Sequence, residues 1–417
     1  MSGVLSYADA AESVARYARA LTPVAARERL ALGEVAGRVL AQAIVADADQ
    51  PPFARSTRDG FAGRAAELNA HGWLPVAGAT HAGEPPPGPL AAGAAWEIMT
   101  GAAVPEDADA VAMLEHVERE GARVRLIAPR ALKAGENVVA QGAQGLAGDV
   151  LIESGARLGA AQMALAATCG YAEIDVFARP RVAILTTGDE LVAVDATPLP
   201  GQIRNSNAPM LAALVTAAGG QAVVLPTAAD TADALGRVLD AALAQAMNAD
   251  LLLISGGVSA GKFDLVEPAL ERRGAQFHFT GVRMQPGKPL VFGDVPRAGI
   301  ALPFFGLPGN PLSSAVTFAL FGTTVLGALA GLPGAGPRFA AAQLSGEADK
   351  KAKPGLTRFL PALADFNPAG GALPQVETIG WQGSGDLPAF ARANCFVVVP
   401  EEAGSLDAGA LVRILLL

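Results

Sequence analysis

The sequence predicts a multidomain protein of the α/β plus β class, built around a central α/β domain with a parallel sheet. Three apolar runs, residues 182–185, 251–254 and 300–305, have the length and branching of buried strands. Helical patterns lie between these runs, which is typical of strand–helix–strand units. Short strand patterns separated by Gly and Pro, from residue 74 to 126 and again after residue 333, indicate β domains before and after the centre.

The composition is that of a globular protein with an acidic balance. Of the 417 residues, 51% are hydrophobic and 17% are charged, which excludes a disordered chain and favours about two to four domains of roughly 150 residues each. The net charge of −9 argues against a nucleic-acid partner, which requires a basic face. Cys169 and Cys395 form no CxxC pair, so neither a zinc site nor a disulfide framework is expected, and a reducing, cytoplasmic compartment fits.

Hydrophobic periodicity predicts several helices, one of them unusually apolar. Residues 312–332 carry no charge and are numerous enough, at about 20, to span a bilayer. Serines and threonines interrupt this segment and a polar loop leads directly into it, so we predict a buried helix and no membrane partner. The other patterns are helical around Tyr7, Val14 and Tyr17 and at 27–40, 160–169, 209–218, 231–247 and 264–273, with a short strand at 222–225.

Each of the three buried-strand patterns ends in a polar turn, at residues 186–190, 255–261 and 306–311. Because parallel strands bring their carboxyl ends to one edge of a sheet, we expect these turns to meet in one crevice. Their glycines let backbone N–H groups approach an anion, and Asn310 followed by Pro311 is typical of a helix start, which adds partial positive charge. Neither glycine turn has the spacing of a P-loop or of G-x-G-x-x-G. The turns therefore predict a site for a phosphorylated small molecule.

Charged side chains near the same edge point to a metal-assisted site. Lys288 stands on a Pro-Gly turn beside the expected crevice, and Asp189, Glu190 and Asp264 place carboxylates there. Carboxylates beside phosphates suggest Mg²⁺, which takes oxygen ligands and bridges to phosphate oxygens. The alternative is that these carboxylates only complement helix N-termini. The 4 histidines are scattered without metal-ligand spacing and support no Ser/His/Asp triad.

Two further motifs are weak on their own: Asp59-Gly60 is typical of a surface turn, and Thr100-Gly101 of a turn that ends a strand. Taken together and in order, however, the motifs resemble those of the molybdopterin molybdenumtransferase family, to which bacterial MoeA and the gephyrin E domain belong. The matching segments cover essentially the whole chain: 52–53 with Ser56 and 59–62, 98–102 with 109–111, 180–191, 255–259, 286–289, 307–311, 383–385 and Asn394.

The resemblance implies four domains per chain. These are a mixed helix/strand N-terminal domain (1–50 and 145–179), a β domain inserted into it (51–144), a central doubly wound α/β molybdopterin-binding domain (180–332) and a C-terminal β domain (333–417). The resemblance also implies a homodimer whose active site is shared between the two chains.

The family's reaction inserts molybdate into adenylylated molybdopterin with Mg²⁺ and releases AMP and molybdenum cofactor. The resemblance implies this activity here, with those two molecules as partners and a contact with the molybdopterin adenylyltransferase. Carried over by position, catalytic roles fall to Asp59, Thr100, Glu190 and Lys288, and metal ligation to Glu190 and Asp264. The substrate-binding positions are Thr187, Gly188, Asp189, Ser255, Gly256, Gly257, Ser259, Pro308, Gly309, Asn310, Arg358 and Ser384.

Several positions depart from the family pattern, among them Glu97, Asn205 and Lys262. Val139 stands where the family has an arginine, Gln144 where it has an acidic residue and Gln285 where it has a lysine. These departures keep open the alternative of a diverged paralogue that binds pterin or molybdenum cofactor without catalysis. A third reading, the related adenylyltransferase, shares only the α/β domain and leaves the segments around Asp59 and Thr100 unexplained.

Overall fold

The computed structural model describes residues 3–24, 26–244, 247–257, 265–297, 300–332, 334–348, 355–367 and 373–417. The chain divides into two compact units. The larger unit comprises residues 1–30, 37–41 and 175–417, and the smaller unit comprises residues 31–36 and 42–174. The finer division into four domains stays a prediction.

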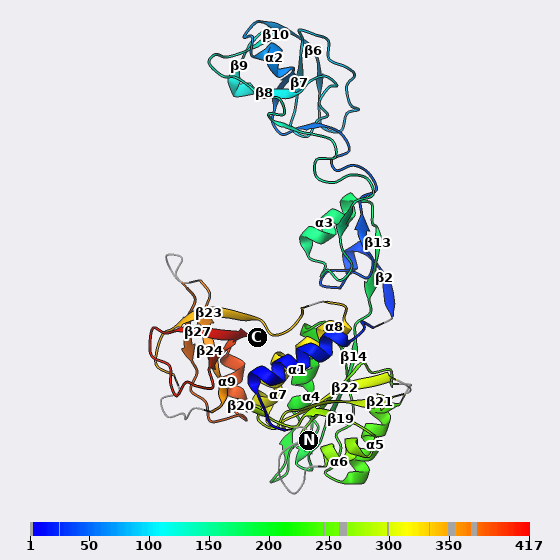
Figure 1. Ribbon diagram of the computed structural model, residues 1–417, viewed down its shortest axis with the longest axis vertical. Helices are drawn as coiled ribbons and strands as arrows, with labels where there is room; N and C mark the ends of the chain where they lie inside the picture. Colours follow the sequence, from blue (N-terminus) through cyan, green and yellow to red (C-terminus); the bar gives the residue numbers. More distant parts are fainter. Residues whose placement is uncertain are drawn as a thin grey trace. The chain divides into compact units, whose positions relative to one another are not determined.

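A six-stranded sheet organises the larger unit (Figure 1). Its strands lie in the order β17 (Gln221–Val224), β14 (Arg181–Thr186), β18 (Leu251–Ser255), β22 (Ile300–Leu307), β21 (Val291–Arg297) and β19 (Gln276–Phe279). The first four run parallel, as predicted. The expectation of a wholly parallel sheet is wrong, because β21 runs antiparallel to both of its neighbours, β22 and β19. Arg297 pairs with Ile300, so β21 turns directly back onto β22 without a crossover helix.

Helices cover both faces of this sheet, which confirms the doubly wound α/β class. Along β14, Val182 and Ile184 enter the core on one face, whereas Ala183 and Leu185 enter the core on the other. The first face packs against α1 (Tyr7–Ala20), α4 (Asn207–Ala217), α7 (Pro311–Thr317) and α8 (Thr323–Leu329), and the second against α5 (Ala232–Leu243) and α6 (Val266–Glu271).

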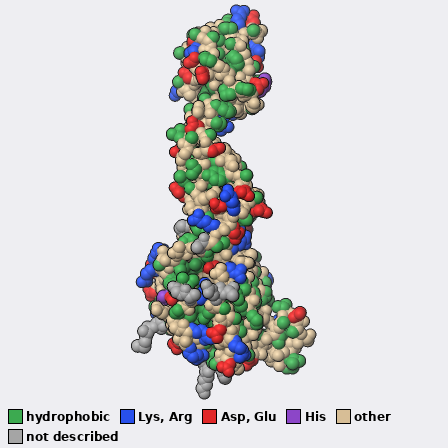
Figure 2. All heavy atoms as spheres, turned by 90° about the vertical axis from the view of Figure 1, so that its right-hand side faces the viewer, with side chains coloured by type: hydrophobic (Ala, Val, Ile, Leu, Met, Phe, Trp, Pro, Cys, Tyr) green, Lys and Arg blue, Asp and Glu red, His purple; other side chains and the backbone are tan. Residues whose placement is uncertain are grey.

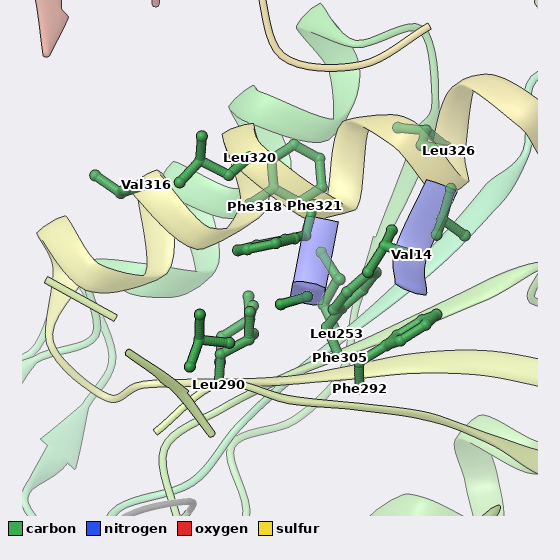
Figure 3. Close-up of a cluster of buried hydrophobic side chains, with 14 of the residues drawn as sticks. Val14, Leu253, Leu290, Phe292, Phe305, Val316, Phe318, Leu320, Phe321 and Leu326 are labelled. Atoms are coloured by element: carbon green, nitrogen blue, oxygen red, sulfur yellow. The ribbon is translucent and has the colours of Figure 1, made fainter. Parts of the chain in front are cut away.

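The first face carries an aromatic core (Figure 3). Phe292 and Phe305 stack with ring centroids 4.7 Å apart, and Leu253 and Val14 belong to the same buried cluster. Burying each such side chain stabilises the fold by about 1.5–3 kcal/mol. Val14 comes from α1, so the predicted amphipathic N-terminal helix is confirmed and closes this face of the sheet.

The apolar segment predicted at residues 312–332 is a helix buried in the same core. It consists of α7, a π-helical turn (Phe318–Gly322) and α8. The whole helix, Pro311–Leu329, is long and apolar enough to cross a membrane by composition, but 78% of its most apolar window is buried inside the protein. The threonine hydroxyls Thr317 and Thr323 donate to helix carbonyls one turn earlier, those of Ser313 and Ala319, each at 2.8 Å, whereas the Ser314 hydroxyl donates to the Pro308 carbonyl before the helix.

A second sheet follows in the C-terminal part of the larger unit. Its order is β1 (Leu5–Ser6), β20 (Val282–Gln285), β24 (Thr357–Asp365), β25 (Gln375–Thr378), β23 (Phe339–Leu344), β27 (Leu411–Leu416) and β26 (Cys395–Val399). Because β26 also pairs with β24, the last five strands close into a barrel, which confirms the predicted C-terminal β fold. One short helix, α9 (Leu387–Arg392), packs beside β24 and α7.

The smaller unit holds the predicted early β region. Its six-stranded sheet has the order β8 (Ala110–Met113), β5 (Gly60–Gly63), β7 (Ala95–Ile98), β6 (Leu74–Thr80), β10 (Arg123–Leu126) and β9 (Val117–Glu120). Phe61 is buried in the core of this sheet, so the β region begins at Gly60 and not at residue 74. The remaining elements are β3 (Ile44–Val45), β4 (Arg55–Ser56), α2 (Ala65–Leu68), a 3-10 turn (Leu114–His116), β11 (Val138–Val139), β12 (Val150–Ile152) and α3 (Ala160–Thr168).

The helix predicted at residues 27–40 is wrong. The segment forms strand β2 (Arg27–Ala31), which pairs with β13 (Glu173–Phe177), followed by a 3-10 turn (Leu32–Glu34). The alanine and arginine content favours a helix locally, but ladder hydrogen bonds to a strand distant in sequence outweigh that preference.

The two-sided core predicts the cost of truncating one central side chain. Leu253→Ala leaves a cavity between β18 and the helices of the first face, and we expect it to lower the free energy of unfolding of the larger unit by about 2–5 kcal/mol. Urea unfolding followed by circular dichroism measures the loss. The control is Leu363→Ala, at a leucine that is 54% exposed, which should change stability by at most about 0.5 kcal/mol. Equal effects of the two substitutions would contradict the described packing.

Candidate functional site

The three polar turns that follow β14, β18 and β22 meet in one pocket of about 840 Å³. This convergence is the central geometric prediction from the sequence, and it is confirmed. The lining includes the predicted residues Thr187, Gly188, Glu190, Ser255, Gly256, Gly257, Pro308, Gly309 and Asn310, together with Leu191, Ile203, Arg204, Asn205, Ser206, Asn207, Asp230, Pro289, Pro311, Gly385 and Leu387.

The register of the parallel strands brings the turns together. Thr186 lies opposite Ser255, and Ser255 lies opposite Leu307, so the strands end at the same level. The Gly256 N–H donates to the Leu307 carbonyl at 3.2 Å and continues this alignment into the turns. Gly256 has a φ of +100°, and a Cβ there would lie 2.6 Å from the Thr187 carbonyl oxygen. Glycine is therefore required where these two turns touch.

Asparagine and serine side chains fix the shape of the pocket. The Asn207 amide donates to the Ser255 hydroxyl at 2.8 Å and to the Gly309 carbonyl at 2.7 Å, so it joins the second turn to the third. Asn205 anchors the start of the same helix: its amide donates to the Thr186 hydroxyl at 2.8 Å, and its Oδ1 accepts from the Ala208 N–H. Thr186, Asn205, Asn207 and Ser255 are buried, and their hydrogen bonds partly offset the loss of water, whereas Asn207 Oδ1 is buried without a hydrogen-bond partner among the described residues.

Asn310 connects the pocket to the C-terminal barrel. It stands at the N-cap of α7 with Pro311 after it, as predicted, but its side chain makes no capping bond. Instead the amide donates to the Ser384 hydroxyl at 2.8 Å, and the Ser384 carbonyl accepts from the Leu312 N–H at 3.1 Å. Ser384 is thus held at the edge of the pocket, next to the lining residue Gly385.

The turn that carries Ser384 is held by a carboxylate cap. Asp386 accepts from the Ala389 N–H at 3.0 Å, at the start of α9, and from the Gln382 N–H at 2.9 Å. These backbone hydrogen bonds keep the pKa of Asp386 below its ordinary value, because they stabilise the charged carboxylate.

Two carboxylates line the pocket, and the sequence reading missed one of them. Glu190 was predicted, whereas Asp230 was not. Asp230 accepts from the Thr187 hydroxyl at 2.8 Å, and its N–H donates to the Asp189 carboxylate at 2.9 Å. Asp189 is not among the lining residues and holds the Asp230 loop instead. Its position in the sequence could have identified Asp230, because this residue follows the short strand β17, which is parallel to β14 and ends at the same edge of the sheet.

Two predicted basic residues do not line the pocket. Lys288 is exposed, and its neighbour Pro289 contributes to the lining instead. Arg358 is buried, with 3% of its surface exposed, and its guanidinium donates to the Ala403 carbonyl at 2.9 Å within the barrel. On the face shown in Figure 2, basic and acidic side chains are interspersed.

Asp59 and Thr100 form a polar pair inside the smaller unit. The Thr100 N–H and hydroxyl both donate to Asp59 Oδ1, at 2.6 and 2.7 Å. These two hydrogen bonds hold the pKa of Asp59 below its ordinary value, the backbone N–H having the larger effect. In the sequence, only the family resemblance links Asp59 with Thr100. Their catalytic role stays a prediction.

Two predicted positions, Ser259 and Asp264, lie outside the described residues. Among the described residues, no group of three or more His, Cys, Asp or Glu side chains is arranged to hold a metal ion. Glu190 and Asp230 are the acidic side chains that line the pocket in this part of the chain.

Three parts of the chain match models of known protein families. The MoeA N-terminal region (domain I and II) matches residues 5–170, a probable molybdopterin binding domain matches 183–328, and the MoeA C-terminal region (domain IV) matches 347–417. The chain is 35% identical to a molybdopterin molybdenumtransferase of Nostoc sp., over 91% of this chain and 86% of the relative. It is 34% identical to the enzyme of that name from Haemophilus influenzae, over 93% of each chain.

A solved structure supports the same relationship. The molybdopterin biosynthesis MoeA protein of Pyrococcus horikoshii OT3 is 25% identical, with a TM-score of 0.80 over 99% of this chain and 100% of that one.

The Asp59–Thr100 pair predicts a measurable pKa change. Thr100→Ala removes the hydroxyl donor and keeps the N–H, so the pKa of Asp59 should rise toward its ordinary value without reaching it. Carboxyl ¹³C shifts of labelled aspartate, followed against pH, measure the change. Thr100→Ser keeps the hydroxyl and should leave the pKa of Asp59 unchanged, and the hypothesis fails if Thr100→Ala behaves in the same way.

The sign of the related pH dependence follows from the lowered pKa. The ionised Asp59 stabilises the folded smaller unit at pH values above the pKa of an unfolded aspartate, and this contribution is lost as the pH falls through the folded pKa. Thr100→Ala should therefore make the smaller unit's stability less dependent on acid pH.

Proposed function

This chain belongs to the MoeA family of molybdopterin molybdenumtransferases, and we propose that it inserts molybdate into adenylylated molybdopterin, with Mg²⁺, to release AMP and molybdenum cofactor. The observation that supports this activity best is the pocket itself. Three turns, rich in Gly, Ser, Thr and Asn, meet there at the carboxyl edge of a doubly wound sheet. Such an edge is where open α/β folds bind phosphorylated ligands.

The glycines of the pocket divide into two groups. Gly188 and Gly256 already donate their N–H groups to the Ala228 and Leu307 carbonyls, so they shape the turns and do not bind anions. Within the described residues, the N–H groups of Gly257 and Gly309 have no hydrogen-bond partner. We assign phosphate oxygens of the substrate to these two donors.

The oxygen donors in the pocket fit Mg²⁺. This ion is held by one or two carboxylates together with substrate phosphates, and it does not need a full protein cage. We propose Glu190 and Asp264 as its ligands, of which Glu190 lines the pocket. When bound, Mg²⁺ would neutralise negative charge on the phosphates and polarise them.

The chain's own contribution is positioning and electrostatics. Molybdate and a pyrophosphate both carry negative charge, and fixed donors can hold them together while the adenylate leaves. Ser384, held by Asn310, contributes a group from the C-terminal barrel. We propose that Lys288 serves the phosphates or molybdate and that Arg358 supports the barrel side of the site.

The remaining parts of the proposal concern assembly. We propose a cytoplasmic homodimer in which Asp59 and Thr100 of the partner chain complete the site, and a contact with the molybdopterin adenylyltransferase that delivers the substrate. The role of Asp59 is supported by its two hydrogen bonds from Thr100, which favour the ionised carboxylate.

The activity is tested by AMP release from adenylylated molybdopterin at low molybdate concentration, with and without Mg²⁺. Glu190→Gln should lower the Mg²⁺-dependent rate by about tenfold or more, since it removes a charged ligand from the pocket. The matched control is Glu271→Gln, at the exposed end of α6, which should keep the rate of the original protein.

Absence of Mg²⁺-dependent AMP release above background would contradict the transferase. Tight pterin binding without turnover would instead favour the non-catalytic paralogue that Val139, Gln144 and Gln285 suggest.

A further inference from the structure

We infer that Arg204 is the phosphate-binding cation of the pocket. The inference rests on the proposed function, because it takes the ligand to be phosphorylated. Among the pocket-lining residues of the described chain, Arg204 is the one lysine or arginine, whereas Glu190 and Asp230 supply negative charge. Without a bound metal these carboxylates repel a phosphorylated ligand, and a cation of the chain at the pocket reduces that repulsion.

The backbone of Arg204 is fixed by a small two-stranded ribbon. β15 (Leu191–Val192) and β16 (Ile203–Arg204) run parallel, with Val192 opposite Arg204. Hydrogen bonds flank the residue on both sides: Ile203 N–H donates to the Glu190 carbonyl at 2.8 Å, and Asn205 N–H donates to the Val192 carbonyl at 2.9 Å. Arg204 is therefore held next to Glu190, the proposed Mg²⁺ ligand, whose metal would bridge phosphate oxygens.

The side chain of Arg204 retains donors that an oxyanion can use. Its Nε donates to the Ala196 carbonyl at 3.0 Å, and its two terminal amino groups have no hydrogen-bond partner among the residues that the structure describes. The side chain is exposed. A guanidinium anchored through Nε presents its terminal nitrogens as a planar pair of donors, which matches two oxygens of a phosphate.

The other predicted cations, Lys288 and Arg358, are not among the described residues that line the pocket. Lys288 is exposed outside the lining, and the Arg358 guanidinium binds the carbonyls of the barrel loop at Ala403 and Gly404. Sequence reasoning did not single out Arg204, because a lone arginine after an isoleucine carries no motif. Only its place beside the pocket distinguishes it.

The test is equilibrium dialysis of the full-length protein with AMP, with adenosine and with molybdate, each alone. Adenosine lacks the phosphate, and molybdate is the other oxyanion of the proposed reaction. The variants are Arg204→Gln, Arg204→Lys and the control Arg237→Gln, at an exposed arginine on α5 that does not line the pocket. Circular dichroism checks that each variant is folded.

We expect Arg204→Gln to weaken AMP binding by about tenfold or more, which is the loss of a charged hydrogen bond, and to leave adenosine and molybdate binding unchanged. Arg204→Lys keeps the positive charge but loses the planar pair of donors, so its AMP affinity should lie between those of the original protein and Arg204→Gln. AMP affinity of the original protein should fall with added salt, and this dependence should be weaker in Arg204→Gln.

The inference is overturned if Arg204→Gln binds AMP like the original protein, if it loses adenosine affinity equally, or if it loses molybdate affinity and keeps AMP affinity. It is also overturned if the original protein does not prefer AMP to adenosine. Because this is a binding measurement, a failure of molybdate insertion leaves its result intact, and the two proposals fail independently.

Discussion

The parallel alignment of β17, β14, β18 and β22 is the constraint on which the rest of the structure depends. It places the carboxyl ends of four strands at one edge of the sheet, so the polar turns that follow them lie side by side there. Hydrophobic cores on both faces hold this alignment, since residues of β14 alternate between them. A shift of one strand by one residue would move each of its side chains into the opposite core, where the side-chain volumes no longer match the packed helices, so the core packing fixes the register at the pocket.

Polar side chains then convert this edge into a defined pocket. Asn207 links the second and third turns, and Thr187 with Asp189 holds Asp230 in the lining. These hydrogen bonds fix the shape of the pocket, from the buried amide of Asn207 to the exposed carboxylate of Asp189. Residues that look like ligand contacts in the sequence therefore divide into those that build the pocket and those that remain available to a ligand.

The C-terminal barrel takes part in the pocket through a few specific connections. β20 leaves the α/β region and pairs with β24 of the barrel, and Asn310 and Leu312 bind Ser384. At the start of the helix that begins at Pro311, the Leu312 N–H donates to the Ser384 carbonyl of the C-terminal barrel region. The side chain of the N-cap Asn310 donates to the Ser384 hydroxyl and makes no capping hydrogen bond with its own helix.

The sequence by itself determined the central strands, the buried helix after Pro311, the two β regions and the three turns of the pocket. Local patterns specify these features: apolar runs of strand length, Gly and Asn at strand ends, and a Pro after an N-cap. Local patterns did not specify β2, whose composition favours a helix although it pairs with β13 as a strand. Nor did they specify the antiparallel direction of β21.

Apart from Glu190, only the tertiary structure decided which charged residues line the pocket. Asp230 and Arg204 line the pocket through the placement of loops around the sheet edge, while Lys288 and Arg358 do not. The physical reason is that a charged side chain costs little at many surface positions, so its local sequence carries almost no signal. Its role is set by strand pairing and by hydrogen bonds to residues distant in the chain.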